Sequence, residues 1–272
     1  MASTIESSWA RATTMIETPL GSRGTGFFVG RRTGPDQWKI ILVTNKHVLH
    51  ADPAARASIQ NVNLHLNVAN NGELAKFTLD YRIRSGTQSA VIEHPDPNID
   101  VLAIDGGSVF QSVPNLANIF VAEDMFATAA KRRELDITAG EDVIVVGYPS
   151  AIRQGKTNAP LIRQGLIASR IGEELHEEAG IVNGQMTYRV TRGFLYDGAA
   201  IPGTSGSPIV LKPTPARRIG NNTVIGEAPP VLLGIVAETR FAPVGNLNSL
   251  GFAGLGLAFD VETIVEVLDL LP

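Results

Sequence analysis

A histidine, an aspartate and a serine follow one another along the 272-residue chain, each at the edge of an apolar run. His47 follows the first of these runs, Asp100 precedes the second, and Ser205 precedes the third. A serine hydroxyl is a poor nucleophile at neutral pH, so it needs a neighbouring base, and that base needs a group that orients it. The three residue types therefore predict nucleophilic catalysis, with Ser205 as the nucleophile, His47 as the base and Asp100 as the group that orients His47.

The glycines around Ser205 suit a loop that stabilises negative charge. Gly203 allows the backbone to bend so that the amides of Gly203 and Ser205 converge on a developing oxyanion, and Gly206 keeps the next turn open. We therefore place an oxyanion hole on the backbone amides of this loop, at Gly203, Thr204 and Ser205.

Alternative functional interpretations of the neighbouring Asp and His residues have weaker support. Asp105 lies near the same strand as Asp100, but Asp100 directly precedes the apolar run, at the strand entrance that faces a cleft. His47 and His50, with Asp52, resemble a set of metal ligands, but His-x-x-His spacing is common and His47 is already assigned as the catalytic base. We predict no metal and no other cofactor, because the chain supplies the base, the nucleophile and the oxyanion donors.

Composition narrows the class of protein. The chain has no cysteine, which removes disulfides, thiolate nucleophiles and cysteine-based zinc sites and is compatible with a reducing compartment. Its 23 Lys and Arg against 27 Asp and Glu give a net charge of −4 with no basic stripe, so nucleic acid is not an expected partner. No stretch approaches the ~20 apolar residues of a membrane span. The N-terminus carries Glu6 and lacks the apolar core of a secretory signal, so a cytoplasmic location is expected if Met1 is the natural start.

The three residues must be held by short β-branched apolar segments, which Gly, Pro, Asn and Asp separate throughout the chain. This pattern is typical of an all-β sandwich or barrel. We predict two groups of six strands: 24–30, 38–44, 62–68, 75–81, 89–93 and 100–104, then 142–147, 161–169, 186–191, 207–211, 231–237 and 254–259. Two six-stranded antiparallel β-barrels are the most economical arrangement of these strands.

Three segments break the strand pattern. Residues 118–135 predict a helical turn or two between the barrels, and residues 212–230 predict a long exposed hairpin connection. Residues 261–271 carry apolar side chains at helical spacing after Asp260, a candidate N-cap, and predict a C-terminal α-helix. We expect a single domain over residues 1–272, with an N-terminal barrel at about 20–115, a linker at about 116–138, and a C-terminal barrel plus helix at about 139–272.

Five motifs, in sequence order, carry a resemblance to a known family: GTGFFVG at 24–30, VTNKHV at 43–48, IDVLA at 99–103, VVGYP at 145–149 and GTSGSP at 203–208. Over roughly residues 20 to 262, the chain resembles the trypsin-like peptidase domain of bacterial HtrA-type and V8-type serine proteases. The order His, Asp, Ser is also that of chymotrypsin-type hydrolases and differs from the order in α/β-hydrolases and subtilisin-like enzymes. The resemblance implies a chymotrypsin-like fold and a catalytic triad of His47, Asp100 and Ser205.

The chain departs from these families in two ways. HtrA-type enzymes usually carry PDZ domains after the protease domain, and we expect none here, because the motifs run nearly to the end of the chain. Thr204 stands where these families usually carry Asn or Asp. Because threonine has no charge to pair with a new N-terminal amine, activation by zymogen cleavage is not expected.

The resemblance also implies a substrate-binding pocket whose walls include Ala199, Pro202, Ala237, Glu238 and Thr239. Ala199 stands where trypsin-like enzymes of basic specificity carry an acidic residue, which argues against cleavage after Lys or Arg. Val236 replaces the pocket histidine with which V8-like enzymes prefer Glu. We expect a small or medium apolar residue before the scissile bond.

The first functional hypothesis is a serine endopeptidase that acts on protein or peptide substrates through an acyl-enzyme. The alternative is a trypsin-like domain that binds, or that stays latent until a regulatory partner protein remodels its oxyanion loop, and Thr204 is the feature that favours it. An esterase or a self-processing hydrolase uses the same chemistry and also stays open. The sequence gives no indication of the oligomeric state.

Overall fold

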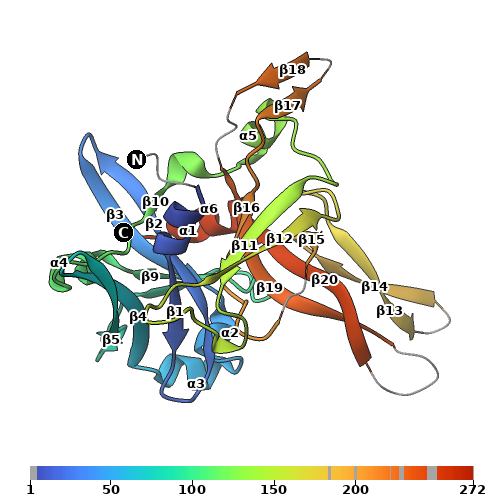
Figure 1. Cartoon of the computed structure of the whole chain (residues 1–272). Coiled ribbons are helices and arrows are strands. Elements are labelled where there is room, and N and C mark those ends of the chain that lie inside the picture. Colours follow the sequence, from blue (N-terminus) through green and yellow to red (C-terminus); the bar gives the residue numbers. More distant parts are fainter. Residues whose placement is uncertain are drawn as a thin grey trace.

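A computed structural model describes residues 5–182, 185–198, 201–220, 222–226, 230–243 and 250–271. Strands dominate, and they form two halves that lie side by side, the N-terminal half in blue to teal and the C-terminal half in yellow to red (Figure 1). Within the described residues, no helix has the length and apolar character needed to span a membrane.

The N-terminal half is a sheet of eight strands in the order β5-β4-β1-β2-β3-β9-β8, with β10 parallel to β2. Its strands are β1 (Thr13–Glu17), β2 (Arg23–Gly34), β3 (Gln37–Thr44), β4 (Asn61–Asn70), β5 (Glu73–Arg82), β8 (Val91–Glu93), β9 (Leu102–Asp105) and β10 (Val121–Ala122), and β6 (Arg84–Ser85) and β7 (Gln88–Ser89) form a short hairpin beside them. β1 precedes the predicted boundary at residue 20, yet it lies inside the sheet between β4 and β2. The first strand of this half therefore begins earlier than the sequence indicated.

The C-terminal half is a closed six-stranded barrel in the order β11-β12-β15-β20-β19-β16. Its strands are β11 (Asp142–Gly147), β12 (Leu161–Ile167), β15 (Phe194–Asp197), β16 (Pro208–Leu211), β19 (Leu232–Pro243) and β20 (Leu250–Asp260). The predicted all-β class is thereby confirmed, together with the C-terminal six-stranded barrel and the C-terminal helix. The N-terminal half was predicted as a second six-stranded barrel, but the pairing of its described strands gives an eight-stranded sheet.

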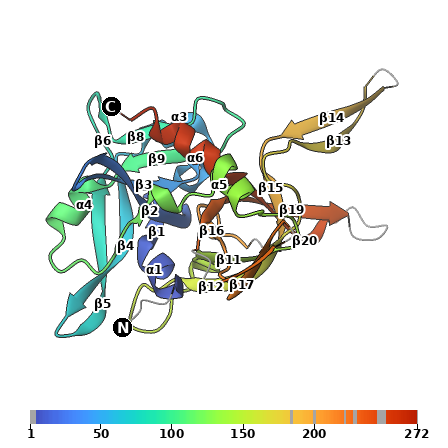
Figure 2. The same ribbon diagram turned by 90° about the horizontal axis from the view of Figure 1, so that it is seen from above.

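One predicted barrel strand was assigned wrongly. Residues 186–191 belong to β14 (Gln185–Thr191), which pairs with β13 (Leu175–Val182) in a hairpin that projects from the barrel (Figure 2). The sixth barrel strand is β15, whose Phe194 and Tyr196 are fully buried, whereas Tyr188 and Val190 on β14 are 54% and 49% exposed. Both segments have the composition of a strand, and composition does not say which sheet a strand joins.

The helices are short: α1 (Ile5–Ala12), α2 (Lys46–Leu49), α3 (Pro53–Ser58), α4 (Gly107–Ser112), α5 (Ala129–Glu134) and α6 (Val261–Leu268), with 3-10 turns η1 (Glu123–Met125) and η2 (Pro149–Ala151). α6 confirms the predicted C-terminal helix, and the side chain of Asp260 caps it by accepting a hydrogen bond from the N–H of Thr263 at 3.3 Å. α5 and η1 supply the helical turns predicted between the halves. The predicted exposed connection contains the hairpin β17 (Ala216–Ile219) and β18 (Asn222–Ile225).

A shared apolar core joins the two halves. Phe27 on β2 and Val146 on β11 belong to one buried cluster, which also contains Trp9 of α1 and Ile264 of α6. Burying a large apolar side chain contributes about 1.5–3 kcal/mol, so this cluster strongly disfavours separation of the halves. The edges that the two halves present to each other are therefore held in a fixed relation.

Candidate active site

Strand register brings His47 and Asp100 together. Thr44, the last residue of β3, pairs with Leu102, the first residue of β9, so His47 on α2 and Asp100 before β9 leave the sheet at the same edge. One carboxylate oxygen of Asp100 accepts the backbone N–H of His47 at 3.1 Å, and the other is hydrogen-bonded to His47 Nδ1. The side chain of Asn45 donates to the backbone carbonyl of Asp100 at 2.6 Å, which holds the loop in place.

The rival carboxylate, Asp105, lies elsewhere. It pairs with Ile41 at the far end of β9, and its Oδ1 accepts the N–H of Gly107 at 2.9 Å. Asp100 is therefore the aspartate that contacts the imidazole of His47.

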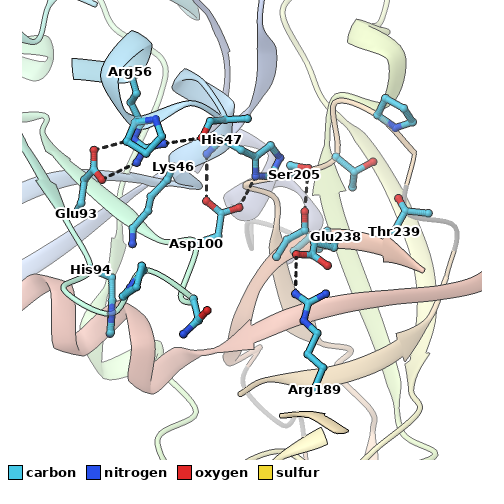
Figure 3. A pocket seen from close by; sticks show the side chains of 18 of the residues that line it. Lys46, His47, Arg56, Glu93, His94, Asp100, Arg189, Ser205, Glu238 and Thr239 are labelled. Carbon is cyan, nitrogen blue, oxygen red and sulfur yellow. Dashed lines mark hydrogen bonds and ion pairs between the residues drawn. The ribbon is translucent and has the colours of Figure 1, made fainter. Parts of the chain in front are cut away.

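Ser205 lies in the turn before β16, on the opposite side of the same cleft. The N–H of Gly206 donates to Val236 O at 2.9 Å, which ties this turn to β19. Figure 3 shows the imidazole of His47 between the carboxylate of Asp100 and the side chain of Ser205. The hydroxyl of Ser205, however, donates to the carbonyl of Ala237 at 3.1 Å, so its proton is directed away from His47 in this structure.

The backbone N–H groups of the oxyanion loop, residues 203–205, differ in whether they are already hydrogen-bonded. Gly203 has φ +93°, a left-handed conformation that favours glycine, and a Cβ there would overlap the carbonyl oxygen of Tyr148. Thr204 was predicted among the amide donors, but its N–H is already bound to Ile201 O at 2.9 Å within the loop. The candidate oxyanion donors are therefore the amides of Gly203 and Ser205.

A cleft of about 1230 Å³ contains His47, Asp100 and Ser205. Four of the predicted substrate-binding residues also line it: Pro202, Ala237, Glu238 and Thr239. The fifth, Ala199, lies outside the described residues. The structure thus brings together segments of both halves that the sequence separates by more than 150 positions.

The cleft also contains charged residues that the sequence analysis did not single out. Arg189 on β14 faces Glu238 across a 3.9 Å ion pair (Figure 3). Lys46, next to His47, donates to Asp96 O at 2.9 Å, and burial lowers the pKa of its ammonium group. Adjacency to His47 was a usable signal for Lys46, whereas Arg189 reaches the cleft only through the hairpin's position in space.

The other histidines have contacts of their own. Within the part of the chain that the structure describes, no three His, Asp or Glu residues gather in a way that could hold a metal ion. His50 accepts the N–H of Asp52 at 3.0 Å. His94, in the turn that precedes Asp100, is 6% exposed and contacts Glu266 Oε2 of α6 at 2.7 Å. The turn packs against the C-terminal helix, which the local sequence does not reveal.

Residues 24–213 match the family model described as trypsin-like peptidase domain. No match was found among proteins of curated function.

Three similar solved structures are of the Rv3671c protease of Mycobacterium tuberculosis. The inactive form of a serine-to-alanine mutant has 16% identity and a TM-score of 0.49, covering 98% of this chain and 90% of that one. A second inactive form has 17% identity and a TM-score of 0.47, covering 98% and 92%. The active form has 17% identity and a TM-score of 0.47, covering 98% and 83%.

Proposed function

This chain is a serine protease that belongs to the trypsin-like peptidase family, and we propose that it cleaves peptide bonds through His47, Asp100 and Ser205. The observation that carries the proposal is the pairing of His47 Nδ1 with the carboxylate of Asp100 in the cleft that also holds Ser205. Because Asp100 occupies Nδ1, the Nε2 atom is the imidazole nitrogen that can take the serine proton.

In the proposed reaction, Ser205 Oγ bonds to the carbonyl carbon of the scissile peptide while its proton passes to His47 Nε2. The amides of Gly203 and Ser205 then hold the negative oxygen of the tetrahedral intermediate. His47 returns the proton to the leaving amine as the C–N bond breaks. Water, deprotonated by the same imidazole, releases the acyl group and restores Ser205.

The hydroxyl of Ser205 must turn before this reaction can begin. It donates to Ala237 O at 3.1 Å, and this bond must break before the proton can be directed to His47. A substrate backbone N–H that donates to the same Ala237 carbonyl would compete with the serine and release its proton. Substrate binding would then itself help to assemble the reactive arrangement.

We also propose that the residue before the scissile bond is small or medium and apolar. The cleft wall beside Ser205 supports this, because it includes Ile201, Pro202, Val236 and Ala237. A peptide library that varies this position tests the proposal, and preferred cleavage after Lys, Arg, Asp or Glu would contradict it.

Fluorophosphonate labelling followed by intact-mass measurement tests the central proposal. We expect a single adduct on the wild type and none on Ser205→Ala, because a fluorophosphonate reacts with an activated serine. A peptide substrate should be cleaved by the wild type only. No adduct on folded wild-type protein would contradict the proposal.

A latent protease is the second candidate, and the hydrogen bond from Ser205 to Ala237 favours it. In that case the isolated chain would be labelled slowly, and a peptide bound in the cleft, or a partner protein, would accelerate labelling. Equal labelling rates with and without a cleft-binding peptide would argue against latency.

A further inference from the structure

Thr25 belongs to the N-terminal half, yet its polar groups contact the loop that carries Ser205. It lies on β2 and is fully buried. Its N–H donates to the carbonyl of Ser205 at 2.9 Å, and its hydroxyl donates to the carbonyl of Gly203 at 2.8 Å. Thr25 thus holds the two residues whose amides are the candidate oxyanion donors.

The direction of each hydrogen bond at this hydroxyl is fixed by its partners. The N–H of Tyr148 can only donate, so Thr25 Oγ1 accepts it, at 3.1 Å. The carbonyl of Gly203 can only accept, so the single proton of Thr25 Oγ1 is committed to it. The hydroxyl therefore links the loop after β11 to the oxyanion loop through two consecutive hydrogen bonds, which we call the relay.

A second contact fixes the neighbouring peptide plane. The carbonyl of Pro202 accepts the N–H of Ser150 at 2.6 Å. In a planar trans peptide the C=O and N–H groups point in opposite directions, so the N–H of Gly203 points away from Ser150. Ser150 and Ala151 have φ of 52° and 58°, left-handed values that cost energy in non-glycine residues and persist where the surroundings hold them.

From these contacts we infer that Thr25 is a positioning residue for the oxyanion hole. Its hydroxyl fixes the carbonyl of Gly203, and Tyr148 anchors that hydroxyl from the other side. The inference rests on the proposed catalytic role of Ser205. Since the hole acts on charge that develops in the transition state, Thr25 should affect kcat more than KM.

The test compares Thr25→Val, which removes the hydroxyl but keeps the shape, with Thr25→Ser, which keeps the hydroxyl. Removing an oxyanion donor lowers kcat by about 10²–10³-fold, and a misplaced donor should cost less, so we expect about a 10- to 100-fold fall in kcat for Thr25→Val. KM and the pH profile should change little, and Thr25→Ser should recover most of the rate.

A matched control is Thr14→Val. Thr14 is also fully buried, lies on the adjacent strand β1 opposite Gly26, and donates its hydroxyl to the carbonyl of His65 at 3.0 Å, away from the oxyanion loop. This variant should be destabilised similarly but keep its kcat. An equal loss of kcat in Thr14→Val and Thr25→Val, or none in a folded Thr25→Val, would overturn the inference. If Thr25→Val does not fold, Thr25→Cys, with its weaker donor, replaces it in the same comparison.

Amide hydrogen exchange gives a readout that does not depend on activity. The N–H of Tyr148 should be protected in the wild type and in Thr25→Ser and should exchange faster in Thr25→Val, while Thr14→Val leaves it protected. Unchanged protection in Thr25→Val would refute the relay even if the protein proved to be an active protease. Conversely, a wild type that resists fluorophosphonate but shows the expected exchange pattern would refute the catalytic proposal and retain the positioning contact.

Discussion

Replacing Asp100 by asparagine tests the proposed role of the carboxylate without changing its shape. The carboxylate accepts two groups of the same residue: the backbone N–H of His47 at 3.1 Å through one oxygen, and Nδ1 through the other. A carboxamide has one oxygen and one NH₂ group, so it cannot accept both. Asp100→Asn must therefore lose one of the two contacts.

Both orientations of the new amide impair the site. If its oxygen keeps the backbone N–H, its NH₂ group faces Nδ1, which forces the imidazole proton onto Nε2 and removes the lone pair that would take the proton of Ser205. If its oxygen faces Nδ1, its NH₂ group opposes the N–H of His47. Loss of the correct tautomer in a Ser-His-Asp enzyme lowers kcat by about 10⁴-fold, which corresponds to about 5.4 kcal/mol in activation free energy.

The assay is kcat on a cleaved peptide for the wild type and Asp100→Asn, with the imidazole tautomer read from ¹⁵N NMR of labelled histidine. Asp105→Asn is the matched control, because Asp105 lies at the other end of β9 and contacts Gly107. It should retain the wild-type rate. A folded Asp100→Asn protein within tenfold of the wild-type kcat would refute the assigned role, and the NMR tautomer would show which of the two orientations the new amide adopts.

Two further predictions concern stability. Burial lowers the pKa of His65, despite its contact with Glu17, and Arg153 donates to its Nδ1 at 3.0 Å. The imidazole of the unfolded chain has a pKa of about 6.5 and takes up a proton more readily than the folded one. The neutral, buried His65 therefore contributes fully to the free energy of unfolding above that pH, and its contribution declines as the pH falls below it. Urea unfolding between pH 7.5 and 5 should show a weaker pH dependence in His65→Gln, and an identical slope would contradict the assignment. At the C-terminal helix, Asp260→Ala removes the cap on Thr263 and should lower the free energy of unfolding by about 1 kcal/mol, whereas Asp260→Asn, which can still cap, should lose only a fraction of that; equal losses in thermal unfolding would argue against capping.

Several features followed from the sequence because they depend on neighbours along the chain. The apolar spacing after Asp260 predicted α6, and short β-branched runs between turn residues predicted most strands. His47, Asp100 and Ser205 stood out because each lies in a local motif whose residue types suit one step of a reaction. Their order along the chain is that of chymotrypsin-type hydrolases, and this order led us to expect them in one catalytic triad.

Other features depended on contacts between distant segments. Residues 186–191 have the composition of a barrel strand, but pairing with β13 places them outside the barrel, and the four residues of β15 close it instead. His94 is buried because α6, 172 positions away, packs Glu266 against it. Strand partners and packing neighbours are chosen by the whole core, so no local pattern specifies them.

The orientation of individual polar groups depends on hydrogen bonds between segments that are distant in the sequence. Nothing in the motif around Ser205 indicates that its hydroxyl donates to Ala237, that the amide of Thr204 is used within its own loop, or that Thr25 holds Gly203 from the other half of the molecule. The sequence by itself determined which groups are available for chemistry. Only the packing of the two halves determined where each proton and lone pair points, because a hydrogen bond requires its donor and acceptor to meet within about 3 Å and in line.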